Sequence, residues 1–388
     1  MYIGQKIRIC AAILIYCLSG FAASGKNPHD PVRGLWVVRN EITNPSKIDR
    51  VLSDADRWHI TDLFVQVRGR GDAYYHSRIE PHADNLLPGF DPLGYLLLRA
   101  RNYNFRVHAW INVFYIWSRK EPPQSRLHPM NRFPDQMAYP ANYQRSGPNQ
   151  KDPKVSRGNS EGVFVSPLLP AVQRHIFAVV DDLLDNYPVD GIHFDYIRFP
   201  NRNFDFRPEI RRRFRKKFVL DPLEFKQNPA KILRKYSSTG YEVFVEQWAE
   251  FLRNGLSDFV HKITDHIRKR KRKLIISAAV KADLSKAHWE YFQEWDKWVR
   301  KGWLDWALPM NYTPVYSVFK RRLDSYRSAG AASKCVIGIA LYNQPLTSAL
   351  SQIKQAEKMR FHGIVLFSYR QLNEMNKYQQ KMVTSLLK

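Results

Sequence analysis

The sequence predicts a (β/α)8 barrel, an α/β fold in which eight parallel strands form a closed ring inside a ring of helices. Three observations predict it. Eight short apolar runs recur along the chain, and stretches with one apolar face at helical spacing lie between them. In addition, no glycine-rich phosphate loop follows an early run, whereas a doubly wound open sheet, the alternative fold, would normally carry one.

The eight apolar runs are the predicted strands. They are nearly continuous in hydrophobic residues, as strands buried on both faces must be. Each run ends in polar or aromatic residues, and these ends meet at one edge of a parallel barrel. The runs occupy residues 34–38, 62–67, 105–112, 189–194, 274–280, 304–310, 336–341 and 362–367.

The stretches between the runs are the predicted helices. In the first of them, Ile48, Val51, Leu52 and Ala55 recur at helical spacing and define one buried face. Residues 172–183 repeat the same pattern. Further helices are predicted over residues 242–272, 285–300, 318–328 and 346–360, with a last one near the end of the chain.

Two connections are too long for simple crossovers. Residues 115–168, after the third predicted strand, are rich in proline and have no clear helical period. A long loop on the carboxyl side of a barrel is typically a lid or a cleft wall, and otherwise a disordered tether. Residues 200–241, after the fourth strand, are basic and predicted to be a helical insertion.

The first residues differ from the rest of the chain. Lys6 and Arg8 precede an apolar run over residues 9–18, which small residues follow, and this is the pattern of a secretory signal peptide over residues 1–24. The alternative, an uncleaved anchor, is disfavoured because the run is shorter than the ~20 residues of a spanning helix. We therefore expect an exported protein, periplasmic or on the cell surface, with residues 25–388 as one barrel domain and no membrane span after cleavage.

Cysteine content and charge restrict the remaining function classes. Only Cys335 follows the predicted signal, so the mature chain cannot form an internal disulfide. The net charge is +25, but the densest basic runs, residues 211–217 and 268–273, are predicted at helix ends, where basic side chains are favoured. We expect no nucleic-acid partner, and an anionic envelope surface accounts for the charge. Polyanion binding is the weaker alternative.

The richest strand end is that of the fourth strand. Asp190 begins the strand, whereas Asp195 ends it beside Tyr196 and Arg198. Chemistry in this fold lies at the carboxyl ends of the strands, so Asp195 is the first candidate catalytic residue. A carboxylate there can act as a nucleophile or as a general acid or base at an acetal carbon. The alternative is a structural aspartate that pairs with Arg198 or Arg68.

The second and third strands supply further candidates. Arg68 and Asp72 lie in a glycine-rich turn after the second strand, where either sugar contacts or a braced loop would use an arginine and an aspartate. His108, Trp110 and Asn112 alternate along the third strand and should point together into the barrel and its mouth. A core position is the safer interpretation for His108, whereas Asn112 is the better ligand contact.

The ends of the sixth and eighth strands add Asn311, Tyr312 and Tyr369. Aromatic side chains beside polar groups suit pyranose rings, whose C–H faces stack on them. Together with Tyr196, Arg198 and the residues of the second and third strands, they complete the predicted substrate-binding set.

A glycosidase usually needs a second carboxyl group. We rank Asp72 and Glu161 above Glu41 and Asp283 for this role. Metal and nucleophile motifs such as HExxH, CxxC pairs and GxSxG are missing from the sequence, so we expect neither a metal nor another cofactor.

Several of these segments resemble the glycosyl-hydrolase-like family 10 barrels of bacteria. The resemblance implies an envelope (β/α)8 barrel that hydrolyses a glycan, with Asp195 in the cleft and with peptidoglycan strands as the substrate suggested for some relatives. Many relatives have two adjacent aspartates in the fourth-strand motif, whereas Tyr196 follows Asp195 here. The segments that resemble the family are residues 33–36, 66–75, 108–112, 165–167, 190–200 and 309–312.

Two hypotheses follow for the function. The first is an O-glycosyl hydrolase that acts on an envelope polysaccharide. The second is a non-catalytic glycan-binding barrel that keeps the aromatic side chains but not the acid/base pair. New reducing ends after incubation with a wall glycan would distinguish the first from the second.

Overall fold

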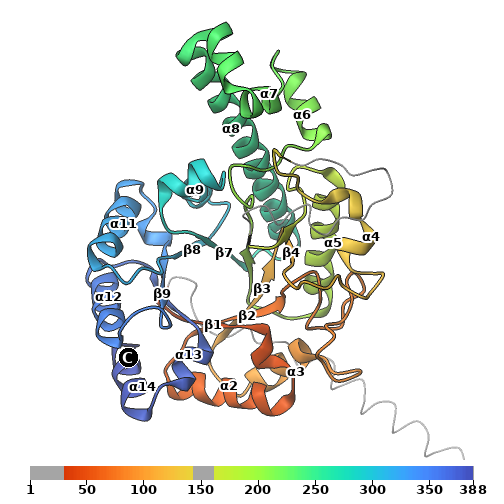
Figure 1. The fold of residues 1–388 in the computed structure, drawn as a ribbon. Coiled ribbons are helices and arrows are strands. Elements are labelled where there is room, and N and C mark those ends of the chain that lie inside the picture. Colours follow the sequence, from red (N-terminus) through yellow and green to blue (C-terminus); the bar gives the residue numbers. More distant parts are fainter. Residues whose placement is uncertain (1–29, 143–160, 388) are drawn as a thin grey trace, which may run out of the picture.

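The computed structural model, which describes residues 30–142 and 161–387, contains a closed barrel of eight parallel strands (Figure 1). The strands are β1 (Val32–Val37), β2 (Asp62–Arg68), β3 (Arg106–Asn112), β6 (Gly191–Asp195), β7 (Ile275–Lys281), β8 (Trp306–Met310), β9 (Val336–Ala340) and β10 (Gly363–Phe367). Around the ring they follow chain order and close where β10 pairs with β1. The predicted (β/α)8 barrel is therefore confirmed. The predicted signal peptide lies outside the described residues.

All eight predicted strands exist, and their ends shift by at most two residues. The prediction for β6 began at Val189 and the one for β8 began at Leu304. Both side chains are buried, but neither belongs to the strand ladder. Hydrophobic runs therefore located the strands well and extended them slightly too far into apolar loop residues.

Helices surround the ring. In α2, the predicted apolar face is buried, and the Asn44 side chain accepts a hydrogen bond of 3.0 Å from the Lys47 backbone N–H to cap the helix. The helices that cover the barrel are α2 (Pro45–Arg57), α3 (Pro92–Ala100), α5 (Pro170–Asn186), α8 (Pro229–Arg270), α9 (Leu284–Glu290), α10 (Trp295–Arg300), α11 (Tyr316–Ser328), α12 (Leu346–Lys358), α13 (Tyr369–Glu374) and α14 (Lys377–Thr384).

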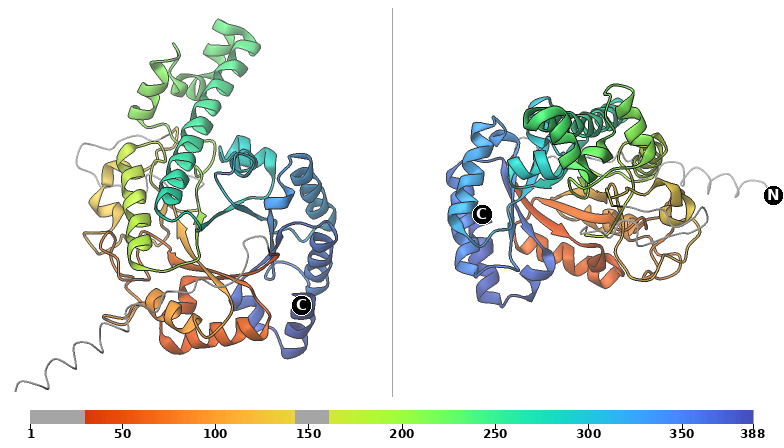
Figure 2. Two further views of the ribbon diagram at one scale, coloured as in Figure 1. Left: turned by 180° about the vertical axis from the view of Figure 1, so that it is seen from behind. Right: turned by 45° about the horizontal axis from the view of Figure 1, so that its top comes forward.

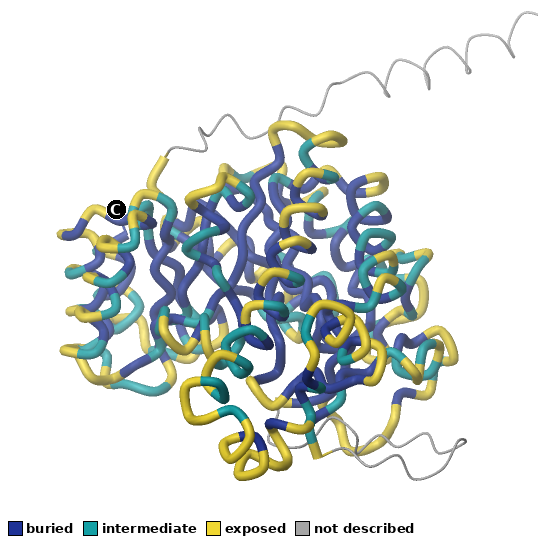
Figure 3. Tube along the Cα trace, turned by 90° about the horizontal axis from the view of Figure 1, so that it is seen from above, coloured by how far each residue is buried: buried dark blue, intermediate teal, exposed yellow. Residues whose placement is uncertain are grey.

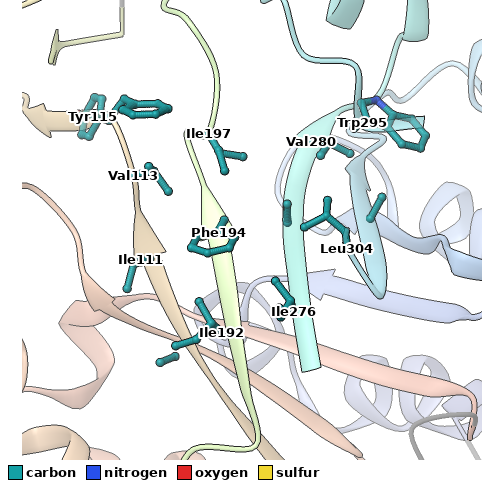
Figure 4. Close-up of a cluster of buried hydrophobic side chains, with 14 of the residues drawn as sticks. Ile111, Val113, Tyr115, Ile192, Phe194, Ile197, Ile276, Val280, Trp295 and Leu304 are labelled. Atoms are coloured by element: carbon teal, nitrogen blue, oxygen red, sulfur yellow. The ribbon is translucent and has the colours of Figure 1, made fainter. Parts of the chain in front are cut away.

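The core has two layers, because alternate residues of each strand face opposite sides. Figure 4 shows the outer layer, in which Ile111 of β3, Phe194 of β6 and Val280 of β7 lie on the helix-facing side of their strands. The inner layer fills the barrel itself and includes Trp36 and Phe64. Buried residues accordingly concentrate on the strands and the inner helix faces (Figure 3). The barrel is thus a packed core and not a channel.

The proline-rich connection after β3 is more ordered than predicted. Its two ends form an antiparallel pair, β4 (Tyr115–Trp117) and β5 (Val163–Phe164), with α4 (Pro129–Arg132) and the 3-10 helix η2 (Pro134–Gln136) between them. The predicted long connection therefore contains short strands and helical turns in its described residues, and residues 143–160 of the connection lie outside them. These short paired strands escaped prediction because segments of two or three residues show no periodicity.

The predicted insertion after β6 is helical. It consists of α6 (Pro208–Arg215), α7 (Pro222–Gln227) and the first part of α8, which is interrupted at Ser237 (φ 66°). This part extends beyond the ring of helices (Figures 1 and 2). None of the described helices, α8 included, combines the length and hydrophobicity that a bilayer-spanning helix needs.

Candidate active site

The candidate site lies at the carboxyl end of β6. His193 points into the barrel, where its Nδ1 lies 2.9 Å from Ser277 Oγ and its ring packs on Trp36 and Phe64. Phe194 faces the helices instead. Because side chains alternate along a strand, Asp195 is the last residue of β6 on the inner side. The predicted position of Asp195 at the barrel mouth therefore agrees with the geometry.

Asp195 is a nearly isolated carboxyl group. Its exposed fraction is only 6%, its Oδ1 accepts a 2.6 Å hydrogen bond from the Tyr196 backbone N–H, and within residues 30–142 and 161–387 it forms no ion pair. Burial raises its pKa to about 6, although this hydrogen bond and the Arg198 charge oppose the shift. A carboxyl group with this pKa is partly protonated near neutral pH, so it can donate a proton.

Glu161 is the carboxylate whose charge acts on Asp195. Its two oxygens each lie 3.0 Å from Arg198 Nη2, and Lys281 Nζ lies 3.3 Å from its Oε1. Partial burial alone would raise the pKa of Glu161, but the charges of Arg198 and Lys281 outweigh it and lower that pKa. Glu161 is therefore ionised where Asp195 is still partly protonated. We call these four residues the Asp195 cluster.

The cations of this cluster are held by aromatic rings. The Arg198 guanidinium lies 4.8 Å from the Tyr196 ring and 4.9 Å from the Tyr291 ring, and Lys281 Nζ lies 4.4 Å from the Tyr291 ring. These contacts are within the range of cation–π attraction. Tyr196 adopts φ 52° and stacks on Tyr115 at 4.5 Å. The first strand of the proline-rich connection thus forms one wall beside Asp195.

A second group of aromatic side chains lies at the same end of the barrel. The half-buried Tyr312 packs on Phe367 at 5.4 Å and edge-on against Trp36 at 6.2 Å. Burial raises the pKa of Tyr312, and the charge of Asp195 raises it further, so this phenol stays protonated and can donate a hydrogen bond. Tyr342 packs against the rings of both Tyr312 and Phe367, and its side chain is 55% exposed. Accessible ring faces near a carboxyl group suit a sugar.

Arg68, a predicted substrate contact, has a different position. Its guanidinium forms two 2.6 Å hydrogen bonds to Glu80, whose Oε1 also lies 2.7 Å from His175 Nε2. Arg68 also donates to the Asn112 carbonyl oxygen. Both Arg68 and Glu80 are fully buried, so the Arg68 guanidinium is not accessible to a sugar hydroxyl group. Arg68 therefore stabilises the loop after β2, and we call Arg68, Glu80 and His175 the Glu80 cluster.

The three candidates on β3, His108, Trp110 and Asn112, do point inward together, but each of them is hydrogen-bonded to other protein groups. His108 Nε2 lies 2.9 Å from Asp62, near the opposite end of the strands. Trp110 donates to Asn112 Oδ1 at 3.0 Å, and Asn112 Nδ2 donates to the Gly69 carbonyl at 2.7 Å. Asn112 pairs with Asp195 across the β3–β6 ladder. It therefore positions the neighbouring strand ends, and His108 and Trp110 fill the core.

Asn311 and Tyr369 face away from the mouth. Asn311 is fully buried, donates to the Phe319 carbonyl at 3.2 Å and accepts from Arg322 at 3.0 Å, so it contacts α11. Tyr369 donates a 2.8 Å hydrogen bond to Asp54 of α2. The expectation that Asp195, Arg68, Asn112 and Asn311 gather around a common mouth is corrected. Arg68, Asn112 and Asn311 are paired within the fold, whereas Asp195, although buried, forms no ion pair among the described residues.

The other carboxyl candidates are separate from Asp195. Asp72 accepts a 2.7 Å hydrogen bond from the Arg70 backbone N–H. Its charge acts on a side chain near β2: burial is the larger cause of the raised pKa of Tyr74, and the Asp72 charge is the second. Asp283 caps α9 by accepting from the Lys286 N–H at 3.0 Å. Glu41 lies in the 3-10 helix η1 (Arg39–Ile42). Of the two carboxylates ranked first, the structure brings Glu161 to Asp195.

Three residues of the site, Lys281, Tyr291 and Tyr342, were not predicted from the sequence. For Lys281 a signal existed: it ends β7, two residues after Ala279 and four after Ser277, and so belongs to the inward series. Tyr291 and Tyr342 lie in loops, where no periodicity marks them. Within the described part of the chain, no group of three His, Cys, Asp or Glu side chains is arranged to hold a metal ion.

Comparison with known proteins identifies the family to which the chain is similar. The family model of glycosyl hydrolase-like 10 matches residues 31–357. "Glycosyl hydrolase DigH" of Escherichia coli K12 is 24% identical over 365 residues, which cover 82% of this chain and 75% of that protein. "Glycosyl hydrolase YngK" of Bacillus subtilis is 23% identical over 159 residues, 39% of this chain and 28% of that protein.

Solved structures show the same fold at low identity. The glycoside hydrolase domain of PgaB (BpsB) from Bordetella bronchiseptica superposes with a TM-score of 0.67 at 14% identity, covering 91% of this chain and 98% of that domain. The catalytic domain of a β-amylase from Paenibacillus polymyxa gives 0.61 at 11% identity and covers 91% and 96%. The barrel is thus one that glycoside hydrolases use.

Proposed function

This chain belongs to the glycosyl hydrolase-like 10 family, and from that premise we propose that it is a glycosidase in which Asp195 is the general acid. The observation that carries the proposal is the contrast within the Asp195 cluster. Burial raises the pKa of Asp195 to about 6, whereas Arg198 and Lys281 lower the pKa of Glu161. Two carboxyl groups whose pKa values diverge in this way can divide acid and base roles between them.

In the proposed reaction, protonated Asp195 donates its proton to the glycosidic oxygen as the C–O bond breaks. Glu161, ionised, is the second carboxylate that glycosidases need at the developing oxocarbenium ion and for the incoming water. Arg198 and Lys281 keep Glu161 charged and fix its position. Tyr312 and the exposed Tyr342 offer ring faces and a phenol hydrogen bond to the bound sugar.

We further infer that the substrate is a polysaccharide of the bacterial envelope, and peptidoglycan glycan strands are the first candidate to test. Residues 1–24 have the charge and hydrophobicity pattern of an export signal, and the chain keeps a strongly positive charge that suits an anionic surrounding. Export and substrate are both tested by locating the protein in cell fractions and by digesting purified wall glycans.

A non-catalytic, glycan-binding barrel is the second candidate. It is favoured by the fact that Arg198 and Lys281 occupy both oxygens of Glu161. One experiment separates the two functions. The purified protein is incubated with peptide-free glycan strands, and both binding and new reducing ends are measured. New reducing ends that disappear in Asp195→Asn support the glycosidase, whereas binding without new ends supports the second candidate.

A further inference from the structure

A pocket lies where the insertion after β6 meets the barrel. Its volume is about 360 Å3, within the size range of small-molecule sites. The loop after β6, α7, α8 and the end of α9 form its walls. We propose that this pocket is a second saccharide subsite, which binds an acidic sugar residue of the same glycan chain that reaches Asp195. The proposal rests on the proposed glycan substrate and goes beyond it by naming a subsite and its charge.

The walls of this pocket are aromatic. Trp248 packs on Phe206 at 5.5 Å, and both are buried, so they form a rigid floor. Trp289 is 47% exposed, and the half-buried Tyr241 also lines the pocket. Indole and phenol faces stack on the C–H faces of pyranose rings. The rings therefore fit a sugar.

The pocket also has an excess of positive charge. Arg202 lies 3.5 Å from Glu290, and both are substantially accessible. Lys226 lines the same pocket, and among the described residues no carboxylate lies within ion-pair distance of it. Its pKa is lowered by burial and then by the Arg202 charge, and the Glu290 charge opposes this shift only in part. An anionic group on the ligand would relieve this repulsion, so a carboxylate-bearing sugar fits better than a neutral one.

A short turn joins this pocket to the Asp195 cluster. Tyr291 faces Arg198 and Lys281, while its chain neighbour Phe292 lines the pocket. The Tyr291 carbonyl accepts a 3.3 Å hydrogen bond from the Phe199 N–H, and the Phe199 and Phe292 rings pack edge-on at 5.3 Å. The pocket is thus adjacent to the Glu161 side of the barrel mouth. The proposal therefore requires a glycan long enough to reach both places.

Titration calorimetry on the full chain carrying Asp195→Asn tests the subsite without hydrolysis of the probe. The two probes are peptide-free peptidoglycan glycan strands, which carry lactyl carboxylates, and a neutral chito-oligosaccharide of the same length. Trp289→Ala should weaken both probes about tenfold, as expected for a lost ring contact. Lys226→Gln should weaken the acidic probe about fivefold, the effect of one partly exposed ion pair, and leave the neutral probe unchanged.

Matched controls are available on the same molecule. Tyr378→Ala removes an aromatic side chain that is 73% exposed on α14, and Lys216→Gln removes a basic side chain of the insertion that does not line the pocket. Neither should change binding. If Trp289→Ala and Lys226→Gln bind both probes as tightly as their parent, the subsite is overturned, even where the wild-type protein releases reducing ends. If the wild-type protein neither binds nor cleaves either probe, the proposed function fails together with the subsite.

Discussion

Two buried clusters of charged residues lie in this barrel, and they differ in how their carboxyl groups are paired. In the Glu80 cluster, Arg68 and His175 hold Glu80, and their charges and hydrogen bonds outweigh burial and lower its pKa. In the Asp195 cluster, the cations pair with Glu161, and burial raises the pKa of Asp195 to about 6. A closed cluster stabilises the fold, whereas an unpaired buried carboxyl group is held ready to exchange a proton.

The largest expected effect is a loss of activity when the Asp195 cluster is changed. Asp195→Asn keeps the shape but removes the proton donor, so glycan hydrolysis should fall about 10³-fold, within the usual range for a general acid. The rate of reducing-end formation measures it. Circular dichroism of both proteins verifies the fold. A variant with wild-type activity would remove Asp195 from the chemistry.

A substitution in the Glu80 cluster should lower the stability of the fold and leave the activity nearly unchanged. Glu80→Gln leaves Arg68 and His175 without their carboxylate in a fully buried place, so the free energy of unfolding should fall by about 3 kcal/mol. Urea unfolding measures the change. The activity per folded molecule should stay within about threefold of wild type. A large loss of activity with unchanged stability would assign Glu80 to the site instead.

Glu161→Gln and Asp72→Asn compare the two carboxylates ranked first from sequence. Glu161 acts on Asp195 and Asp72 does not, so the first substitution should lower kcat/KM about 10²-fold and the second by less than about threefold. Initial rates on the same glycan measure both. The reverse order would make Asp72 the partner of Asp195.

The smallest effect is a gain of stability. The folded-state pKa of Asp195 lies above its ordinary value of 3.8, so its contribution to stability is fully present below that value and is lost as the pH rises through about 6. Asn does not titrate. The free energy of unfolding of Asp195→Asn should therefore be higher than that of wild type by on the order of 2 kcal/mol at pH about 8. At pH about 4 the two values should differ little. Equal urea midpoints at both pH values would contradict this.

The same proton gives a pH dependence of the reaction. A general acid must be protonated, so kcat/KM should fall about tenfold per pH unit above about 6. The Glu161→Gln variant should keep a descending limb, but at lower pH, because the Glu161 charge that helps to raise the pKa of Asp195 is removed. A limb that rises through pH about 6 would give Asp195 the role of base or nucleophile.

The barrel could be predicted from the sequence because its strands and helices follow from hydrophobic patterns along the chain. The strand runs and the face of α2 followed from hydrophobic periodicity, and the position of Asp195 at the carboxyl end of the fourth run predicted that it lies at the barrel mouth. Partners across the fold have no such pattern. Arg68 was predicted at the mouth, but its partners Glu80 and His175 come from a loop and from α5, and sequence spacing does not reveal them.

Alternation, applied more strictly, would have improved the predicted site. Trp306, Leu308 and Met310 face the barrel interior, so Asn311 had to face α11. The same reasoning adds Lys281 at the end of β7. Tyr369 begins α13, where the period changes from two to 3.6 and the alternation no longer applies. Tyr291 and Tyr342 lie in loops, and only the folded chain brings them to the mouth.

The most direct test is the pKa of Asp195 itself. Carbon-13 NMR of protein labelled at the aspartate carboxyl carbons follows each group with pH. Burial also raises the pKa of Asp205 to about 6, so Asp195→Asn and Asp205→Asn are needed to assign the two signals. We predict a resonance that titrates near pH 6, is missing in Asp195→Asn and persists in Asp205→Asn. An Asp195 resonance that titrates near 3.8, the ordinary aspartate value, would contradict the account.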